Sequence, residues 1–88
     1  MTTKKINFPI SGGMQAKAAS EITNYFRSFE GTVQLIYKTN TANAKSIISL
    51  LSVGVSMDEE IEIKIESKDE EKDINDFIEF LKSLNNLE

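Results

Sequence analysis

The amino-acid sequence predicts a single α+β domain, an open-faced sandwich with helices on one face of a sheet and water on the other. Two patterns predict this class. Residues 60–66 alternate charged and apolar side chains without interruption, which is the period of a half-buried strand. Residues 70–84 space their apolar side chains by three and four, the period of a helix with one buried side. A chain of 88 residues that is 40% hydrophobic has enough material for one core, so we expect one domain over residues 1–88.

The first third of the chain predicts a strand followed by a helix. An extended segment over 5–10 places every second residue on one side, and Pro9, which has no N–H, indicates a strand end or an edge position. Two glycines at 12–13 interrupt this segment. A helix of about 14 residues is expected to start near Gln15 and to end before Gly31. The inward residues are Ile6, Phe8 and Ile10 in the strand and Ala16, Ala19, Ile22, Phe26 and Phe29 in the helix.

The middle of the chain predicts a hairpin and a short helix. In residues 32–37, Val33, Leu35 and Tyr37 alternate with the residues between them, which predicts a second strand. A turn at 38–40 follows, since the asparagine at its end tolerates a positive φ, and 41–42 belong to a short third strand. Residues 44–51 are expected to form a short helix, with Gly54 supplying a left-handed residue at its end.

The last part of the chain predicts a strand and a long helix. The strand over 60–66 is followed by Ser67-Lys68-Asp69-Glu70, the S-x-x-E pattern of a capping box. Acidic residues at the start of the helix and Lys82 near its end suit the helix dipole. Its apolar stripe consists of Ile74, Phe77, Ile78, Leu81 and Leu84. The element order is therefore β-α-β-β-α-β-α, and the final Leu87-Glu88 is compatible with a tail left by cloning.

Composition excludes several classes of function. The net charge of −4 provides no positive field for nucleic acid or for an anionic membrane surface. The absence of cysteine removes disulfides and Cys-ligated zinc, and we expect a cytoplasmic protein. Neither the apolar core of a signal peptide nor a run of eighteen apolar residues occurs. The absence of histidine removes the commonest general base, phosphoryl acceptor and metal ligand, so we expect neither a metal nor a cofactor.

Two places in the sequence carry polar groups that could support chemistry, and the first is the segment around Lys17. The glycine pair at 12–13 lacks dinucleotide-binding spacing, and Lys17 is followed by Ala18 instead of the hydroxyl of a Walker loop. An anion could still bind there, although a flexible connector with a solvated lysine is the simpler interpretation. Residues 69–73 lack the spacing of a calcium loop. The carboxylates at Asp58, Glu59, Glu60, Glu62 and Glu66 are interpreted as a solvated face.

Ser46 is the other candidate, at a predicted helix start beside Lys45. A phosphate there would meet unpaired N–H donors and a cation. The simpler interpretation is a helix cap, which the residues alone favour. The apolar residues that follow are too many for one stripe of a two-turn helix, so some should be exposed, either as a partner site or as ordinary surface aliphatics. These residues are Ile47, Ile48, Leu50 and Leu51.

Two stretches resemble the family of HPr, the histidine-containing phosphocarrier protein of the bacterial sugar phosphotransferase system. Residues 13–19, Gly-Met-Gln-Ala-Lys-Ala-Ala, are similar to the family's active-site pattern Gly-(Ile/Leu)-His-Ala-Arg-Pro-Ala. Residues 43–55, Asn-Ala-Lys-Ser-Ile-Ile-Ser-Leu-Leu-Ser-Val-Gly-Val, resemble its regulatory-serine segment. The resemblance covers nearly the whole chain. It implies a four-stranded antiparallel sheet with three helices on one face.

The resemblance also implies roles for particular residues. In the family, the histidine accepts a phosphoryl group from the first enzyme of the system and passes it to a sugar-specific component. Gln15 stands at that position, and Lys17 and Ala18 replace the family's Arg and Pro, so carrier activity is expected to be lost. Ser46 matches the serine that a dedicated ATP-dependent kinase/phosphorylase modifies in Gram-positive relatives. The catabolite-repression HPr-like subgroup, Crh, also has Gln for His and keeps this serine.

We therefore expect a non-catalytic regulatory protein that is modified on Ser46 and recognised by a transcriptional regulator or another phosphotransferase-system protein in carbon catabolite control. By position, the docking residues are Gln15, Lys17, Lys45, Ile47, Ile48 and Leu51. Three alternatives remain: a diverged phosphocarrier that still takes part in sugar phosphotransfer, an acyl carrier, and an interaction domain whose Ser46 is only a cap. Acyl carriers are helical throughout and carry Asp before their serine, which disagrees with Lys45 and with the strand at 60–66.

Overall fold

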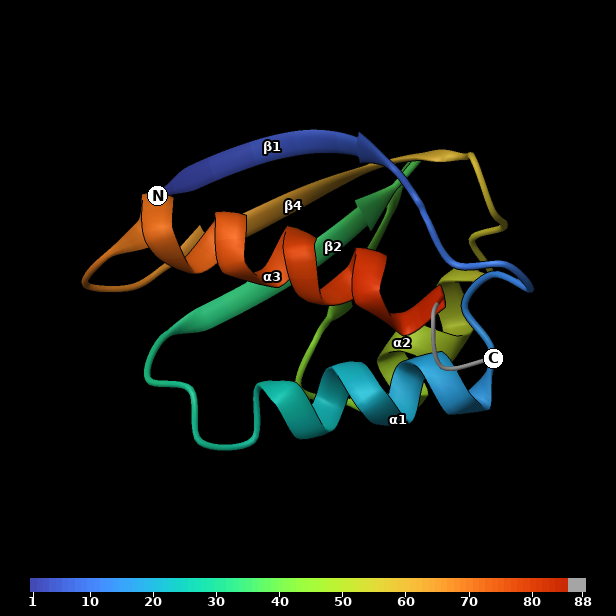
Figure 1. The fold of residues 1–88 in the computed structure, drawn as a ribbon, viewed down its shortest axis with the longest axis horizontal. Coiled ribbons are helices and arrows are strands. Elements are labelled where there is room, and N and C mark those ends of the chain that lie inside the picture. The colour runs from blue at the N-terminus through green and yellow to red at the C-terminus, as the bar shows by residue number, and fades with distance from the viewer. Residues whose placement is uncertain (86–88) are drawn as a thin grey trace.

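Seven elements follow one another in the predicted order β-α-β-β-α-β-α (Figure 1). The computed structural model describes residues 1–85, so Leu87-Glu88 and its interpretation as a cloning tail lie outside the described residues. The elements are β1 (Thr2–Asn7), α1 (Ala16–Tyr25), β2 (Thr32–Tyr37), β3 (Asn40–Asn43), α2 (Ile47–Val53), β4 (Glu60–Glu66) and α3 (Glu70–Leu84). Strand β4 agrees with the sequence prediction at both ends.

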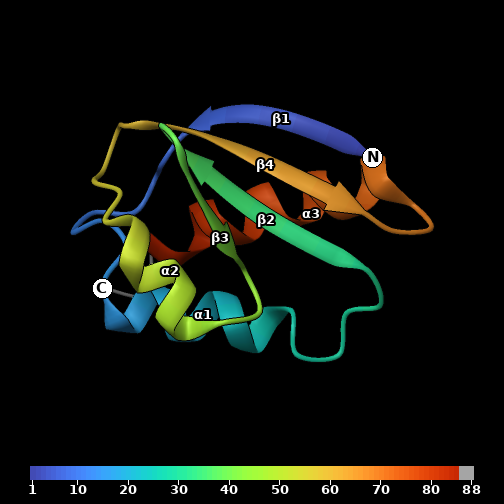
Figure 2. The ribbon, with the colours of Figure 1, turned by 180° about the vertical axis from the view of Figure 1, so that it is seen from behind.

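The four strands form one antiparallel sheet in the order β1-β4-β2-β3. The helices gather on one face of this sheet: α1 and α3 run across it, and α2 packs against β3 and α1 (Figures 1 and 2). Ile61, Ile63 and Ile65 of β4 are buried under the helices, while the residues between them face the other side. The predicted open-faced sandwich is confirmed. No helix within residues 1–85 combines the length and the apolar character needed to span a bilayer.

The core between sheet and helices is apolar, and no polar or charged side chain of residues 1–85 is buried in it. Aromatic rings join α1 to α3. Phe77 of α3 lies 4.7 Å from Phe26, centroid to centroid, and Phe80 stacks on Tyr25 at 4.3 Å. The predicted stripe of α3 is confirmed, since Ile74, Phe77, Leu81 and Leu84 are buried and Ile78 is half-buried.

The predicted bounds of the first strand are wrong. Strand β1 covers Thr2–Asn7 instead of 5–10, because the polar residues at its start pair with the C-terminal end of β4: Thr2 lies opposite Ile65. After Asn7 only Phe8 continues the pairing, with its N–H bonded to the carbonyl of Glu59, and Pro9 has no N–H to extend it. The predicted facing is right, as Phe8 and Ile10 are buried.

The first helix is shorter than predicted and ends at Tyr25. Beyond that point the chain tightens, because the N–H groups of Arg27 and Phe29 bond to carbonyls three residues back, at 3.2 and 3.1 Å. This turn carries the Phe26 ring into the core and places Phe29 edge-on against it at 5.1 Å. Aromatic packing therefore ends α1 well before Gly31.

Two further details differ in the middle of the chain. The positive φ of the hairpin turn falls on Lys38, at 56°, and not on Asn40, which already belongs to β3. Helix α2 starts at Ile47 instead of residue 44 because the N–H of Ala44 still bonds to β2, at the carbonyl of Val33. Gly54 ends α2 with φ of 62°, as predicted.

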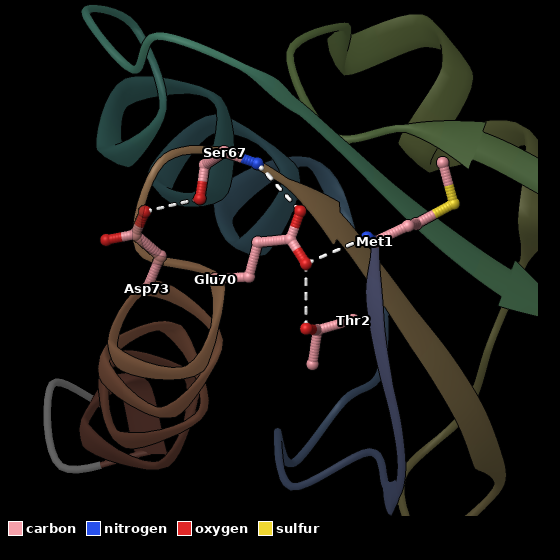
Figure 3. A network of polar contacts seen from close by, with 5 residues as sticks. All are labelled: Met1, Thr2, Ser67, Glu70 and Asp73. Atoms are coloured by element: carbon pink, nitrogen blue, oxygen red, sulfur yellow. Dashed lines mark hydrogen bonds and ion pairs between the residues drawn. The ribbon is translucent and has the colours of Figure 1, made fainter.

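The predicted capping box of α3 is only half formed (Figure 3). The Glu70 carboxylate accepts a hydrogen bond from the Ser67 N–H at 3.3 Å, but the Ser67 hydroxyl donates to Asp73 at 2.7 Å instead of capping the helix. The other oxygen of Glu70 contacts the Met1 ammonium at 2.9 Å and the Thr2 hydroxyl at 2.8 Å. Glu70 therefore ties the edge strand β1 to the start of α3.

The Glu70→Gln substitution should lower stability in a pH-dependent way. Hydrogen bonds from the Met1 ammonium, and then from Thr2, hold the pKa of Glu70 below its usual value. A carboxyl group with a lowered pKa stabilises the fold above its unfolded pKa, and the effect disappears as the pH falls through the folded pKa. In urea unfolding, we expect the free energy of unfolding of Glu70→Gln to lie furthest below that of the wild type near neutral pH. The difference should shrink below about pH 4.5.

The matched control for this experiment is Glu71→Gln. Glu71 is exposed and its closest cation, Lys4, is 3.8 Å away, so removing its charge should change stability little at any pH. If the free energy of unfolding depended on pH in the same way in both variants, the contacts of Glu70 would make no specific contribution to stability.

Candidate functional site

Ser46 caps the N-terminus of α2. Its backbone is extended, with φ of −125° and ψ of 117°, and its Oγ accepts a hydrogen bond from the Ser49 N–H at 3.2 Å. The helix cap predicted from the sequence is thus confirmed. The residue is half-buried and stands where the helix dipole favours negative charge.

A network around this cap was not predicted from the sequence. The Ser49 hydroxyl accepts a hydrogen bond from the Asn43 N–H at 2.9 Å, and the Asn43 side chain accepts one from the Lys45 N–H at 2.9 Å. Two local signals point to it: a second hydroxyl three residues after Ser46, and an asparagine two residues before Lys45, where asparagine side chains favour turns. The network fixes the backbone on both sides of Ser46.

The ammonium group of Lys45 is engaged with the loop that follows α1. Its Nζ donates hydrogen bonds to the carbonyl oxygens of Phe29, at 2.7 Å, and Gly31, at 2.9 Å, and lies 5.7 Å from the centre of the Phe29 ring. The sequence suggested Lys45 as a cation available to a phosphate on Ser46. In the unmodified protein this ammonium group is instead bonded to two carbonyls that lie 16 and 14 residues earlier in the sequence.

An apolar surface follows Ser46 directly. Ile48 is 82% exposed, Ile47 is 41% exposed and Leu51 is 40% exposed. Leu50, by contrast, is fully buried. The prediction that this short helix exposes part of its apolar content is therefore confirmed, and we call Ile47, Ile48 and Leu51 the α2 patch.

Gln15 lies at the N-terminal end of α1. It is exposed and occupies the N-cap position, but its side chain makes no capping hydrogen bond. The preceding loop packs against the segment after α2, since the Met14 N–H donates to the Val55 carbonyl at 2.9 Å. Gly13 permits this approach: its φ is 72°, and a Cβ there would lie 2.6 Å from the same carbonyl oxygen. Lys17 is exposed on the first turn of the helix.

The predicted polar site residues therefore lie near the two ends of α2, and the α2 patch lies on the helix itself. Gln15 and its loop adjoin the segment that leaves α2, through the bond between Met14 and Val55. Ser46 and Lys45 lie at the start of α2, next to the loop that leaves α1. Helices α1 and α2 pack against each other between these points (Figure 2).

Glu59 is not part of the fully solvated acidic face that the sequence predicts, but has structural partners. Glu59 is half-buried, accepts a hydrogen bond from the Tyr37 hydroxyl and accepts another from the Ser56 N–H at 2.9 Å. These bonds, with Tyr37 as the larger cause, lower the pKa of Glu59. It fixes the turn between α2 and β4. No group of three acidic residues within 1–85 is arranged to hold a metal ion.

Comparison with known proteins identifies the family. A family model described as the PTS HPr component phosphorylation site matches residues 2–83. The chain belongs to the HPr family. A phosphocarrier protein HPr from Mycoplasma pneumoniae is 36% identical over 64 residues, which are 72% of this chain and 73% of the relative. The family is named for HPr, a phosphocarrier protein of the phosphotransferase system that interacts with other proteins of that system and is not a catalytic enzyme.

Solved structures share the fold. HPr-C-His from Thermoanaerobacter tengcongensis superimposes with a TM-score of 0.86 at 24% identity, covering 98% of this chain and 97% of that one. Crh from Bacillus subtilis, a catabolite repression protein, gives a TM-score of 0.72 at 25% identity, covering 94% and 95%. The open-faced sandwich of this chain is thus the HPr fold.

Proposed function

We propose that this chain is a regulatory HPr-family protein that is phosphorylated on Ser46 and signals through protein–protein contacts in carbon catabolite control. One observation carries the proposal: Ser46 stands at the N-terminus of α2, directly before the exposed α2 patch. A phosphate there adds about −1.5 to −2 charges next to an apolar surface. A partner can then recognise both features together.

The partners follow from this surface. A dedicated Ser kinase/phosphorylase would modify Ser46, and a cytoplasmic transcriptional regulator or another phosphotransferase-system protein would bind the product. In the unmodified protein the neighbouring cation, Lys45, is bonded to the carbonyls of Phe29 and Gly31. A phosphate dianion offers more acceptors than one ammonium group can use, so the partner's own Arg or Lys residues should share its charge. Gln15 and Lys17, at the other end of α2, would form the second contact area.

Two findings support the regulatory role over phosphate transfer. The family's phosphoryl-accepting position holds Gln15, whose amide nitrogen is not a nucleophile. The likeness to Crh from Bacillus subtilis, named for catabolite repression, adds support from a protein of the same fold. The family match itself favours the alternative, a diverged phosphocarrier that still takes part in sugar phosphotransfer. Labelling with phosphoenolpyruvate and the first enzyme of the phosphotransferase system separates these two functions.

The kinase experiment should give one modified residue. After incubation with an HPr kinase/phosphorylase and ATP, we expect mass spectrometry to show a single phosphate, located on Ser46. Ser46→Ala should remain unmodified, whereas Ser52→Ala, which removes an exposed hydroxyl from the same helix, should be modified like the wild type.

Losing the cap costs about 1 kcal/mol, so circular dichroism must first show that Ser46→Ala is folded. A chain that stays unmodified while an ordinary HPr is phosphorylated in the same tube would contradict the proposal. A phosphate on Ser46→Ala would place the modification elsewhere.

A further inference from the structure

The loop between α1 and β2 is held by the residue immediately before Ser46. The Lys45 Nζ satisfies the carbonyl oxygens of Phe29 and Gly31, at 2.7 and 2.9 Å, and is the one side chain within residues 1–85 that bonds to them. Lys45 itself is exposed. Water can therefore replace it at both carbonyls, and the two bonds form a contact that opens at low cost.

The loop between α1 and β2 also contacts the turn between β4 and α3. Together with the turn between β4 and α3 it borders an open surface groove of about 590 Å³ (Figure 1 shows the two segments at the same end). The loop packs tightly there, since a Cβ on Gly31 would lie 2.3 Å from the Glu66 carbonyl oxygen. Phe29 and Gly31 of the loop form one wall of the groove, and Glu66 and Ser67 belong to the other. A change at Lys45 thus reaches a surface distinct from the α2 patch.

We propose that Lys45 is a latch: a phosphate on Ser46 draws its ammonium away from the two carbonyls and loosens the loop at 29–31, together with one wall of the groove. The inference rests on the proposed modification of Ser46. The attraction of an ammonium ion to a phosphate dianion exceeds its attraction to neutral carbonyl dipoles. The lysine directly precedes the serine, and its four-methylene side chain has the freedom to turn toward a group on the next residue.

Hydrogen exchange at single amides tests the latch. The Phe29 N–H bonds to the Phe26 carbonyl at 3.1 Å and reports on the loop, while the Met14 N–H, bonded to Val55 at the other end of α2, serves as the internal control. Phosphoserine is placed at position 46 during synthesis of the full chain, so the result does not depend on any kinase. The companion variants are Lys45→Met, which keeps the stem but loses the charge, and Lys45→Arg, which keeps the charge.

We expect exchange of the Phe29 amide to rise about fivefold or more in Lys45→Met and in the phosphorylated chain, with Lys45→Arg and the Met14 amide near the wild-type values. Adding the phosphate to Lys45→Met should cause no further rise. Unchanged exchange at Phe29 in Lys45→Met overturns the latch itself. Unchanged exchange in the phosphorylated wild type, or a further rise on phosphorylating Lys45→Met, overturns its coupling to Ser46.

Discussion

Incubation of this protein with phosphoenolpyruvate and the first enzyme of the phosphotransferase system should leave it unlabelled. Gln15 occupies the position at which the family's histidine accepts the phosphoryl group, and the whole chain lacks histidine. An imidazole nitrogen has a free lone pair, whereas the lone pair of an amide nitrogen is delocalised into its carbonyl. The expected transfer is therefore zero, measured as acid-labile, alkali-stable radioactive phosphate beside a labelled HPr control.

The matched variant for this experiment is Gln15→His. The loop that positions residue 15 is intact, with Gly13 packed on the Val55 carbonyl, so the variant should accept phosphate. We expect slower labelling than in HPr because Lys17, a point charge, replaces the forked guanidinium of the family's Arg. Acid-labile phosphate on the wild type would contradict the regulatory function. An unlabelled Gln15→His would show that the residues around position 15 prevent transfer as well.

Truncating Phe77 to alanine should destabilise the protein by about 3–5 kcal/mol. The Phe77 ring is fully buried and joins the two long helices, with Phe26 at 4.7 Å and Tyr25 at 5.8 Å between ring centroids. Its removal leaves a cavity that these neighbours fill only in part. The free energy of unfolding of a natural protein is only about 5–15 kcal/mol. A loss of this size should therefore clearly lower the midpoint of unfolding by urea or heat.

Ile48→Ala is the control for Phe77→Ala. It also removes a large apolar side chain from a helix, but Ile48 is 82% exposed, so stability should change by about 0.5 kcal/mol or less. A large loss at Ile48 would mean that the α2 patch is part of the core and not a surface for partners. A small loss at Phe77 would mean that the aromatic contacts between α1 and α3 contribute little.

Local patterns in the sequence were enough to predict the order of the elements and much of the candidate site. Strand β4 agrees at both ends because alternation over seven residues leaves one face to bury. Gly54 has the expected left-handed conformation, and Ile48 is exposed because a two-turn helix has no room to bury every aliphatic side chain. These features depend on residues within a few positions of one another.

The remaining features depend on groups far apart in the sequence, which no local pattern encodes. Tertiary packing decided where β1 begins, since its polar residues pair with β4, and where α1 ends, since Phe26 turns inward against Phe77. It also gave Glu70 the Met1 ammonium as a partner and Lys45 the carbonyls of Phe29 and Gly31. A charged side chain takes whichever partner the folded chain brings within reach, so its role is set by the tertiary structure.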